Sequence, residues 1–370
     1  MAMYIVKPWY RKKDDAIYGA EWAGTSDPSW VRTDAAVGFA DPNPYYAGMS
    51  STPSSPFDNI MPWSGMRRVT DSNAGELVEI PKFYYKWTRD GVKMKLQISM
   101  SQFDGSHVSP AHADRGDGVG ERDYVYVGRY HCASSNFKSA TGVLPKVNIR
   151  RSSARTSIHN LGSNIWQMDF ALWWTINMLY LVEFANWDSQ AMIGYGCGNN
   201  SSTENSGASD TMPYHTGTMK SNRTTYGVGV QYRYIEDWWA NVADFVDGIY
   251  FVDSSVYCIK SPVNFRDSGG TYVGEKTSVT GTITAWNSPT ASGFEYALCA
   301  SAADSNKINN YVADQTTYYS GTNLVVSGGV ASYCSQVYGA FTMIGNVDDN
   351  YTQDAIGSRL MVLPPSRLSA

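Results

Sequence analysis

Charge is scarce in this sequence. Only 17% of its 370 residues are Asp, Glu, Lys or Arg, whereas soluble domains typically carry about a quarter. The polar surface must therefore consist largely of neutral Ser, Thr, Asn, Gly and Tyr side chains. The net charge is -5 and no stretch is strongly basic. This argues against nucleic acid as a partner, because binding to phosphates requires clustered Lys and Arg.

Long apolar runs are also missing. A membrane-spanning helix needs roughly 18 or more apolar residues, and the most apolar stretch, residues 170–185, is interrupted by Thr175, Asn177 and Glu183. We therefore expect no membrane insertion. The first residues, MAMYIVKPWYRKKDD, lack the apolar segment of a secretory signal peptide. We therefore expect no export by way of a secretory signal peptide.

Cysteine is rare, and no two cysteines are close in sequence. The five cysteines, an odd number, are widely spaced. This spacing argues against a disulfide framework and against a zinc site, so we expect buried free thiols and no cofactor.

Aromatic residues, in contrast, are abundant. They make up 14% of the chain, with 26 Tyr and 12 Trp. Tyr and Trp provide a large contact area at low entropic cost, which is typical of binding surfaces. The alternative is a large aromatic core, which suits Trp better than Tyr because the Tyr hydroxyl needs water or a partner.

The chain divides into two parts at about residue 64. Residues 1–64 predict a small β-rich segment for attachment or oligomerisation, broken by Pro, Gly and Ser. Residues 65–370 predict the ligand-binding domain. In LVEIPKFYYKWTRDG (77–91) apolar residues alternate from Val78 to Trp87 if Pro81 is a bulge. Residues 89–91 predict a hairpin turn before VKMKLQIS.

Two helices are expected in the middle of the chain. The first is SSARTSIHNLG (152–162), with Ser152 or Ser153 as N-cap and Gly162 as its stop. The second spans residues 168–194, with Asp169 at its start, and its Trp-rich face indicates core. The polar run after Gly194 predicts a surface loop. Strands before and after the helices predict an α+β fold with a mixed, mostly antiparallel sheet.

Three segments together resemble the C-type-lectin fold of phage tropism proteins and of formylglycine-generating-enzyme-like domains. They are WDSQAMIG at the end of the second helix, the Trp-rich YRYIEDWWANVADFVDGIYF (232–251), and the pair SGG (327–329) and IGSRL (356–360). The resemblance covers residues 65–370 and implies a C-type-lectin-like domain. Segments near residues 55–87 also resemble proteins encoded by prophages of gut bacteria. Catalytic members of the fold need paired cysteines, and Cys299 and Cys334 lie far apart, so the resemblance implies a binding protein that is not an enzyme.

The resemblance also implies a binding surface between SGG and IGSRL. In the tropism proteins a retroelement diversifies this stretch at adenines of Asn codons, which yields Tyr, Ser, Asp and Val but no Trp, Lys or Glu. Residues 330–354 contain no Trp, Lys, Arg or Glu. An ordinary polar loop is the alternative. The expected ligand contacts are Val330, Ser332, Tyr333, Ser335, Gln336, Tyr338, Thr342, Asp348, Asn350 and Tyr351.

Other candidate sites are weaker. Asn346, Asp348, Asn350 and Asp354 alternate as calcium ligands do, but the glycine and bidentate Glu of a calcium loop are missing. His107 and His112, near Asp114 and Asp117, suggest either a metal patch or, in our preferred interpretation, a solvated loop. Glu236 and Asp237, as neighbours on a strand, should point to opposite faces and form no catalytic carboxylate pair. The RGD triplet at residues 115–117 is short enough to occur by chance.

The resemblance thus implies a phage or prophage tail-tip or tail-fibre protein, a virion component that is released by lysis and acts outside the cell. Its expected partners are a bacterial surface receptor, protein or glycan, and other tail proteins. We expect a homo-oligomer, a trimer by analogy with tail symmetry, so that weak contacts add up. The alternatives are a virion enzyme that degrades glycans, a structural virion protein without a ligand, or a bacterial surface adhesin.

Overall fold

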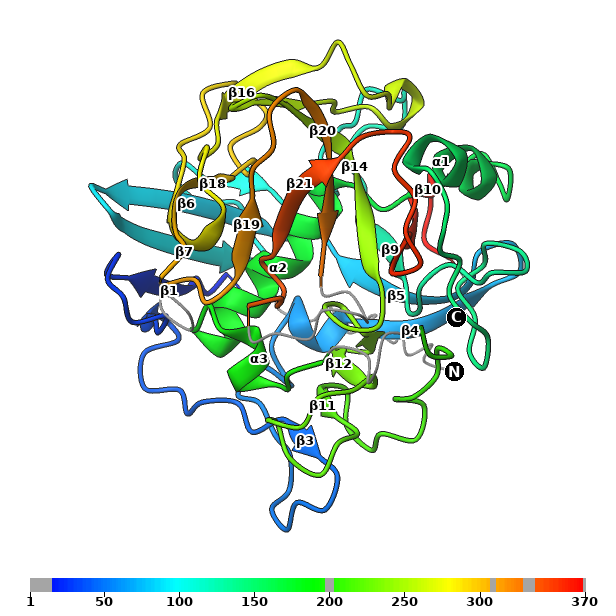
Figure 1. The fold of residues 1–370 in the computed structure, drawn as a ribbon. Coiled ribbons are helices and arrows are strands. Elements are labelled where there is room, and N and C mark those ends of the chain that lie inside the picture. The colour runs from blue at the N-terminus through cyan, green and yellow to red at the C-terminus, as the bar shows by residue number, and fades with distance from the viewer. Residues whose placement is uncertain (1–14, 197–202, 307–310, 329–336, 369–370) are drawn as a thin grey trace, which may run out of the picture.

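Helix α2 (Phe170–Phe184) runs through the centre of the molecule and organises it (Figure 1). All of its residues are buried, because it packs against strand β14 on one side and strands β7 and β1 on another. The Asp169 carboxylate accepts a hydrogen bond from the Leu172 backbone N–H at 2.9 Å and caps the helix. The helix ends at Ala185, which is in the left-handed conformation.

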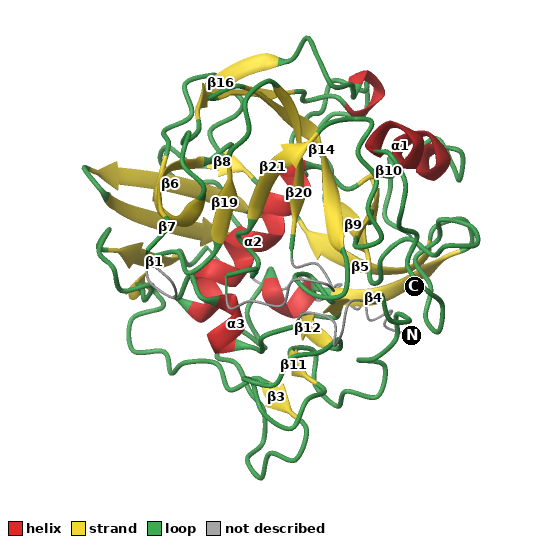
Figure 2. Cartoon of the chain, viewed as in Figure 1, coloured by secondary structure: helices red, strands yellow, loops and turns green. Residues whose placement is uncertain are grey.

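The computed structural model describes residues 15–196, 203–306, 311–328 and 337–368. The described residues include two further helices, α1 (Arg151–His159) and α3 (Ser189–Met192), and two short 3-10 helices, Trp63–Gly65 and Pro262–Asn264. The strands form four sheets, which surround α2 (Figure 2).

Two five-stranded sheets come largely from the first half of the chain. One has the order β2-β1-β7-β6-β8, and the other has the order β10-β23-β9-β5-β4. Their strands are β1 (Tyr18–Trp22), β2 (Val31–Asp34), β4 (Arg67–Asp71), β5 (Gly75–Pro81), β6 (Tyr84–Asp90), β7 (Lys93–Ser99), β8 (His107–Val108), β9 (Tyr124–Gly128), β10 (Ile165–Gln167) and β23 (Leu360–Val362).

The second half of the chain contributes a small sheet and a large one. The small sheet has the order β13-β12-β11-β3, and the large one has the order β16-β15-β14-β20-β21-β19-β17-β18, with β22 paired to β14. Their strands are β3 (Tyr45–Tyr46), β11 (Gly217–Thr218), β12 (Val230–Tyr232), β13 (Ile235–Glu236), β14 (Ala243–Val252), β15 (Ser255–Cys258), β16 (Thr271–Glu275), β17 (Gly281–Trp286), β18 (Ala300–Asp304), β19 (Gln315–Thr317), β20 (Thr322–Ser327), β21 (Met343–Val347) and β22 (Ile356–Gly357).

The predicted fold class is confirmed at the level of α+β. Among the named strands, parallel pairing joins β11 to β3, β14 to β22 and β19 to β21. The other named pairs are antiparallel, as in β5 with β9 and β14 with β20. The sheets are therefore mixed and mostly antiparallel.

The described residues before 65 pack on the same core as the rest. Strand β1 pairs with β7, and Trp22 and Trp63 belong to the same cluster of buried residues as Trp173 and Trp174. The boundary at residue 64 and an attachment role for this segment stay predictions.

Three local predictions were wrong in detail. Helix α1 begins at Arg151, and its N-cap is Arg150, not a serine. The expected second helix breaks at Ala185, and Asp188 caps the separate helix α3. The expected strand over residues 77–91 is two strands in different sheets, because Pro81 ends β5.

The polar run after Gly194 is not simply a surface loop. Ser206, Ser209 and Thr216 are buried. They tolerate burial because they have partners: the Glu236 carboxylate accepts hydrogen bonds from the backbone N–H groups of Gly207 at 2.6 Å and Ser209 at 2.7 Å.

Candidate functional site

The C-terminal residues connect two sheets and present a loop between them. Strand β21 pairs with β20 in the large sheet, β22 pairs with β14, and β23 pairs with β9 in a five-stranded sheet. The loop of residues 348–355 lies between β21 and β22, so both of its ends are held by hydrogen-bonded strands (Figure 1).

Arg359 fixes the far end of this loop. Its side chain is completely buried and pairs with Asp244 at 3.0 Å. The guanidinium also donates to the carbonyls of Gly128 and Arg129, each at 3.0 Å, and of Glu236 at 2.9 Å. Burial would raise the pKa of Asp244, but His131 and Arg359 beside it hold that pKa below its usual value. The arginine of the IGSRL motif thus joins four segments and is not available to a ligand.

A buried carboxylate fixes the segment that precedes β21. Asp314 is buried and accepts hydrogen bonds from the backbone N–H groups of Gly339 and Phe341, each at 2.7 Å. Burial raises the pKa of Asp314 well above its ordinary value. Ala340 is held as well, because its carbonyl accepts a hydrogen bond from Asn177 of α2 at 3.0 Å. Residues 339–341 are therefore part of the core.

The loop itself is exposed. Asp348, Asn350 and Tyr351 are exposed, and Tyr351 retains 37% of its surface. The backbone N–H of Asn350 donates to the Asp348 side chain at 2.8 Å, and that of Tyr351 donates to the Asp348 carbonyl at 3.1 Å. Asp348 thus shapes a turn that brings the three predicted contacts together on one surface. We call Asp348, Asn350 and Tyr351 the C-terminal patch.

Asp349 ties the C-terminal patch to helix α1. Its carboxylate accepts hydrogen bonds from the Ser152 backbone N–H at 3.2 Å and from the Ser152 hydroxyl at 3.0 Å. Because α1 lacks a side-chain cap from its own sequence, Asp349 satisfies an N-terminal N–H in its place. Sequence reasoning missed Asp349, since no local spacing relates residues 152 and 349.

The remaining predicted contacts have different outcomes. Thr342 is completely buried and its hydroxyl donates to the Val337 carbonyl at 3.3 Å, so its prediction as a surface contact was wrong. Thr342 is buried because Asp314 and Asn177 hold residues 339–341 in the core. Tyr338 is half-buried. The other five predictions lie outside the described residues: Val330, Ser332, Tyr333, Ser335 and Gln336.

Glu236 and Asp237 do not lie on opposite faces of a strand. Asp237 follows β13 with a φ of 50°, and both residues are only 1% exposed. Burial, and next the charge of Glu236, raise the pKa of Asp237 well above its usual value. The Asp237 carboxylate accepts from the backbone N–H of Gly229 at 2.8 Å, so its hydrogen bonds serve the fold.

The interpretation of residues 106–123 as a solvated loop was also wrong in part. His112 is buried between the Ser109 hydroxyl at 2.7 Å and the Ile80 carbonyl at 2.9 Å, and burial lowers its pKa to about 3. Arg115 of the RGD triplet is buried and paired with Asp169 of α2, so the triplet is not displayed. His107, in contrast, is exposed.

Within the described ranges, no three His, Cys, Asp or Glu side chains gather in a group that could hold a metal ion. Cys132, Cys258 and Cys299 are free and buried, as the sequence predicted. No helix in the described part of the chain has the length and apolarity to cross a membrane.

Comparison with known proteins adds no relative. No protein-family model matches this chain, and no curated protein matches it significantly.

Proposed function

We propose that this protein is a receptor-binding component of a phage or prophage tail, built on a C-type-lectin-like domain, and that it recognises a bacterial surface ligand through the C-terminal patch. The observation that carries the proposal is the contrast inside residues 337–363. Exposed polar and aromatic side chains at 348, 350 and 351 lie between segments held by Asp314 and Arg359. Such an arrangement keeps contact residues replaceable without loss of the fold.

The order of the elements supports the fold part of the proposal. Strand β9 precedes α1 and α2, the Trp-rich segment provides β13 and β14, and the IGSRL segment provides β22 and β23. The chain thereby returns to pair β23 with β9, so the domain begins and ends in one sheet. This return of the chain to its first sheet supports our proposal of a C-type-lectin-like domain.

The neutral surface supports the binding part of the proposal. With only 17% charged residues, recognition has to rely on hydrogen bonds and aromatic contacts. Tyr351 and the side chains of Asp348 and Asn350 provide both kinds of contact. Each such contact is weak, so display in several copies on a tail, a trimer in our proposal, would raise the avidity.

The test is binding of the fluorescently labelled protein to a panel of bacterial strains, measured by flow cytometry. We expect saturable binding to a subset of strains, and at least a tenfold loss of binding when Tyr351→Ala and Asn350→Ala are combined. Tyr272→Ala, which removes a tyrosine of similar exposure on β16, is the matched control and should bind normally. Equal binding by the double variant and the wild type would contradict a receptor site at the C-terminal patch.

The same strains separate the alternatives. Release of reducing sugars from purified surface polysaccharide would favour an enzyme, which requires two converging carboxylates. Absence of binding to every strain would favour a structural virion protein. A reverse transcriptase gene and a template repeat beside the coding sequence would support diversification of residues 330–354 and would argue against an ordinary bacterial adhesin.

A further inference from the structure

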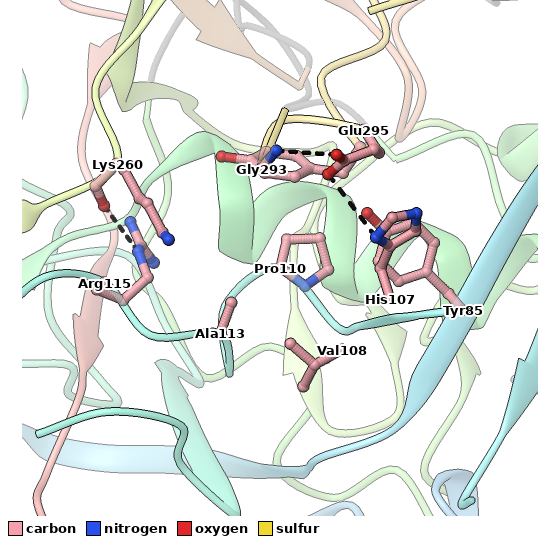
Figure 3. Close-up of a pocket in the computed structure, with 10 residues that line it drawn as sticks. Tyr85, His107, Val108, Pro110, Ala113, Arg115, Lys260, Gly293 and Glu295 are labelled. Atoms are coloured by element: carbon pink, nitrogen blue, oxygen red, sulfur yellow. Dashed lines mark hydrogen bonds and ion pairs between the residues drawn. The ribbon is translucent and has the colours of Figure 1, made fainter. Parts of the chain in front are cut away.

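Two cavities lined by arginine side chains differ in whether a ligand can reach them. The cavity beside Arg115, shown in Figure 3, measures about 130 Å³, and the Arg115 side chain is only 1% exposed. The other cavity measures about 370 Å³ and is lined by Arg67 and Arg367, whose side chains are 38% and 46% exposed. An engineered apolar cavity of about 150 Å³ holds one benzene molecule. The second cavity therefore has room for a substituted ring, and its cationic groups are accessible. We call it the arginine cavity.

The arginine cavity lies where strand β4 begins, β5 ends and β9 begins. Arg67, Pro81 and Tyr124 occupy these three positions and line the cavity. Arg67 is directly opposite Glu79 in the register of β4 and β5, so their side chains lie on the same face of the sheet. Arg367, in the segment after β23, pairs with the same Glu79. The fold thus brings two arginines that are far apart in sequence to one carboxylate.

The Glu79 carboxylate holds both guanidinium groups in place. Its side chain is completely buried and accepts hydrogen bonds from Arg67 Nε at 2.9 Å and Nη2 at 3.3 Å, and from Arg367 Nε at 3.1 Å and Nη2 at 2.5 Å. Burial would raise the pKa of Glu79, but hydrogen bonds from Arg367 and Arg67 hold that pKa below its ordinary value, so Glu79 stays ionised. The Arg367 guanidinium also lies over the Tyr124 ring, 4.1 Å from its centre. Both arginines are therefore oriented before any ligand arrives.

Each arginine keeps donors that the shared carboxylate does not use. Among the residues that the structure describes, Nη1 of Arg67 and Nη1 of Arg367 have no hydrogen-bond partner, although both nitrogens carry N–H donors. Two guanidinium groups share one carboxylate, so one positive charge is left unmatched. Glu121 and Asp123 line an adjoining cavity, but Lys82 pairs with them at 3.8 Å and 2.7 Å, and water screens their exposed carboxylates. Direct contact with the arginines therefore favours an anion.

The donors in the arginine cavity match a phosphate. The N–H groups of arginine bind the oxygens of carboxylates and phosphates. The exposed side chain of Ser64 also lines the cavity and adds a hydroxyl donor. A phosphate ester offers three acceptor oxygens, one for each of Arg67, Arg367 and Ser64, whereas a carboxylate offers two. Met61 and Pro81 give the cavity an apolar wall for the body that carries the phosphate.

We propose that the arginine cavity binds a phosphate ester of a sugar. The phosphate oxygens accept hydrogen bonds from Nη1 of Arg67 and of Arg367 and from the Ser64 hydroxyl. The sugar ring lies against Met61 and Pro81. The same group occurs in free sugar phosphates and in phosphorylated surface polysaccharides. The cavity shares no residue with the C-terminal patch, so the proposal holds whether or not that patch binds a receptor.

The test is isothermal titration of the full-length protein with D-glucose 6-phosphate at low ionic strength. We expect saturable binding, and about tenfold weaker binding of D-glucose, which lacks the anion. Inorganic phosphate lacks the ring and D-glucuronate offers only a carboxylate, so both should bind more weakly than D-glucose 6-phosphate. Added salt should weaken the binding, because both arginines are partly exposed.

A phosphorylated dextran separates the two sources of the phosphate ester. Binding of both D-glucose 6-phosphate and the phosphorylated dextran would support a surface polysaccharide as the natural ligand. Binding of D-glucose 6-phosphate without the dextran would support a free sugar phosphate. Unphosphorylated dextran is the control and should not bind.

The variant Arg367→Ala tests the anion contact. Glu79 keeps its hydrogen bonds from Arg67 and from the Tyr126 hydroxyl, the latter at 2.9 Å, so the fold should be preserved. Binding of D-glucose 6-phosphate should fall about tenfold. Arg367→Lys should restore only part of the affinity, because lysine lacks the planar fork of arginine.

Two further variants separate a local contact from a general effect of charge. Ser64→Ala leaves Glu79 and both arginines in place, and should weaken binding about threefold. Arg68→Ala is the matched control, because Arg68 is exposed and follows Arg67 on β4, so its side chain points to the opposite face of the sheet. The Arg68 variant should bind D-glucose 6-phosphate normally.

Several results would overturn the proposal. They are equal affinity for D-glucose and D-glucose 6-phosphate, unchanged affinity in a folded Arg367→Ala variant, equal losses in Arg367→Ala and Arg68→Ala, and no binding of D-glucose 6-phosphate at millimolar concentration. Equal affinity for inorganic phosphate or for D-glucuronate would overturn the choice of a sugar phosphate. None of these results would bear on the cell-binding test, which uses variants of residues 350 and 351.

Discussion

Helix α2 and the C-terminal patch differ in where their side chains lie. In α2 all fifteen residues are buried, and Trp173 and Trp174 contact further aromatic rings from distant segments. In the C-terminal patch the side chains at 348, 350 and 351 are exposed and bond chiefly within their own loop. The comparison shows that the side chains we propose for recognition contribute little to the contacts that hold the fold together.

The largest effect is expected in the aromatic core. Trp174 is fully buried, its indole N–H donates to the Leu298 carbonyl at 3.2 Å, and its ring meets Trp286 at 5.5 Å. Trp174→Ala should lower the free energy of unfolding by about 3–5 kcal/mol, measured by denaturant titration. Trp174→Phe should cost clearly less. Equal losses for both variants would show that ring volume is not what matters there.

The buried arginine under the loop should rank next. Arg359→Met leaves Asp244 with His131 but without its arginine and removes one donor from each of three carbonyls, and should cost about 3 kcal/mol or more. Arg68→Met removes an exposed arginine on β4 and should change the free energy of unfolding by less than about 0.5 kcal/mol. A small loss for Arg359→Met would contradict its role as the anchor of the C-terminal segment.

Buried His112 should make the stability of the core depend on pH. Burial lowers its pKa to about 3, while the unfolded chain titrates near about 6.5. Between these values the unfolded state binds more protons, so stability is full above pH ~6.5 and is lost as pH falls towards about 3. The slope from one proton is at most about 1.4 kcal/mol per pH unit. His112→Gln should reduce the slope of the free energy of unfolding against pH over this range. An unchanged slope would show that other groups cause it.

The contact between the C-terminal loop and helix α1 should show an intermediate effect. Asp349→Ala removes the cap that the C-terminal loop provides to α1, and should cost about 1 kcal/mol. Asp349→Asn keeps an acceptor and should restore most of the loss. Hydrogen exchange of the Ser152 amide, faster in the alanine variant only, would report the broken cap directly.

The smallest effect on stability is expected in the C-terminal patch. Tyr351→Ala removes a side chain whose hydroxyl meets only Gln353 of the same loop, at 3.3 Å. The free energy of unfolding should change by less than about 0.5 kcal/mol, by the same denaturant titration. A loss comparable to that of Trp174→Ala would show that this tyrosine belongs to the core.

The features that depend on local residue patterns could be predicted from the sequence. The α+β class, the hairpin of β6 and β7, the existence of α1 and α2 and the burial of the tryptophans of α2 follow from apolar spacing and turn residues. The end of α2 at Ala185 was missed because Asp188, a cap for a new helix, competes with a continuous apolar pattern. The separation of β5 from β6 was missed because Pro81 was interpreted as a bulge rather than as a strand end.

Long-range partners could not be predicted from the chain. Ser209 is buried because the Glu236 carboxylate accepts hydrogen bonds from its backbone N–H and its hydroxyl, and Thr342 is buried because Asp314 holds the residues before it. Asp349 and Arg115 find their partners at Ser152 and Asp169 across 197 and 54 residues. Such pairs appear only once the sheets are assembled, so the cavity at Arg115 left no recognisable signal in its local sequence.

The separation of stability from recognition is tested most directly by one pair of measurements on one protein, the triple variant Asp348→Ala, Asn350→Ala, Tyr351→Ala. We expect its denaturation midpoint to match the wild type closely, while its binding to a recognised bacterial strain falls at least tenfold. A variant that keeps its binding, or that loses as much stability as Trp174→Ala, would contradict the account.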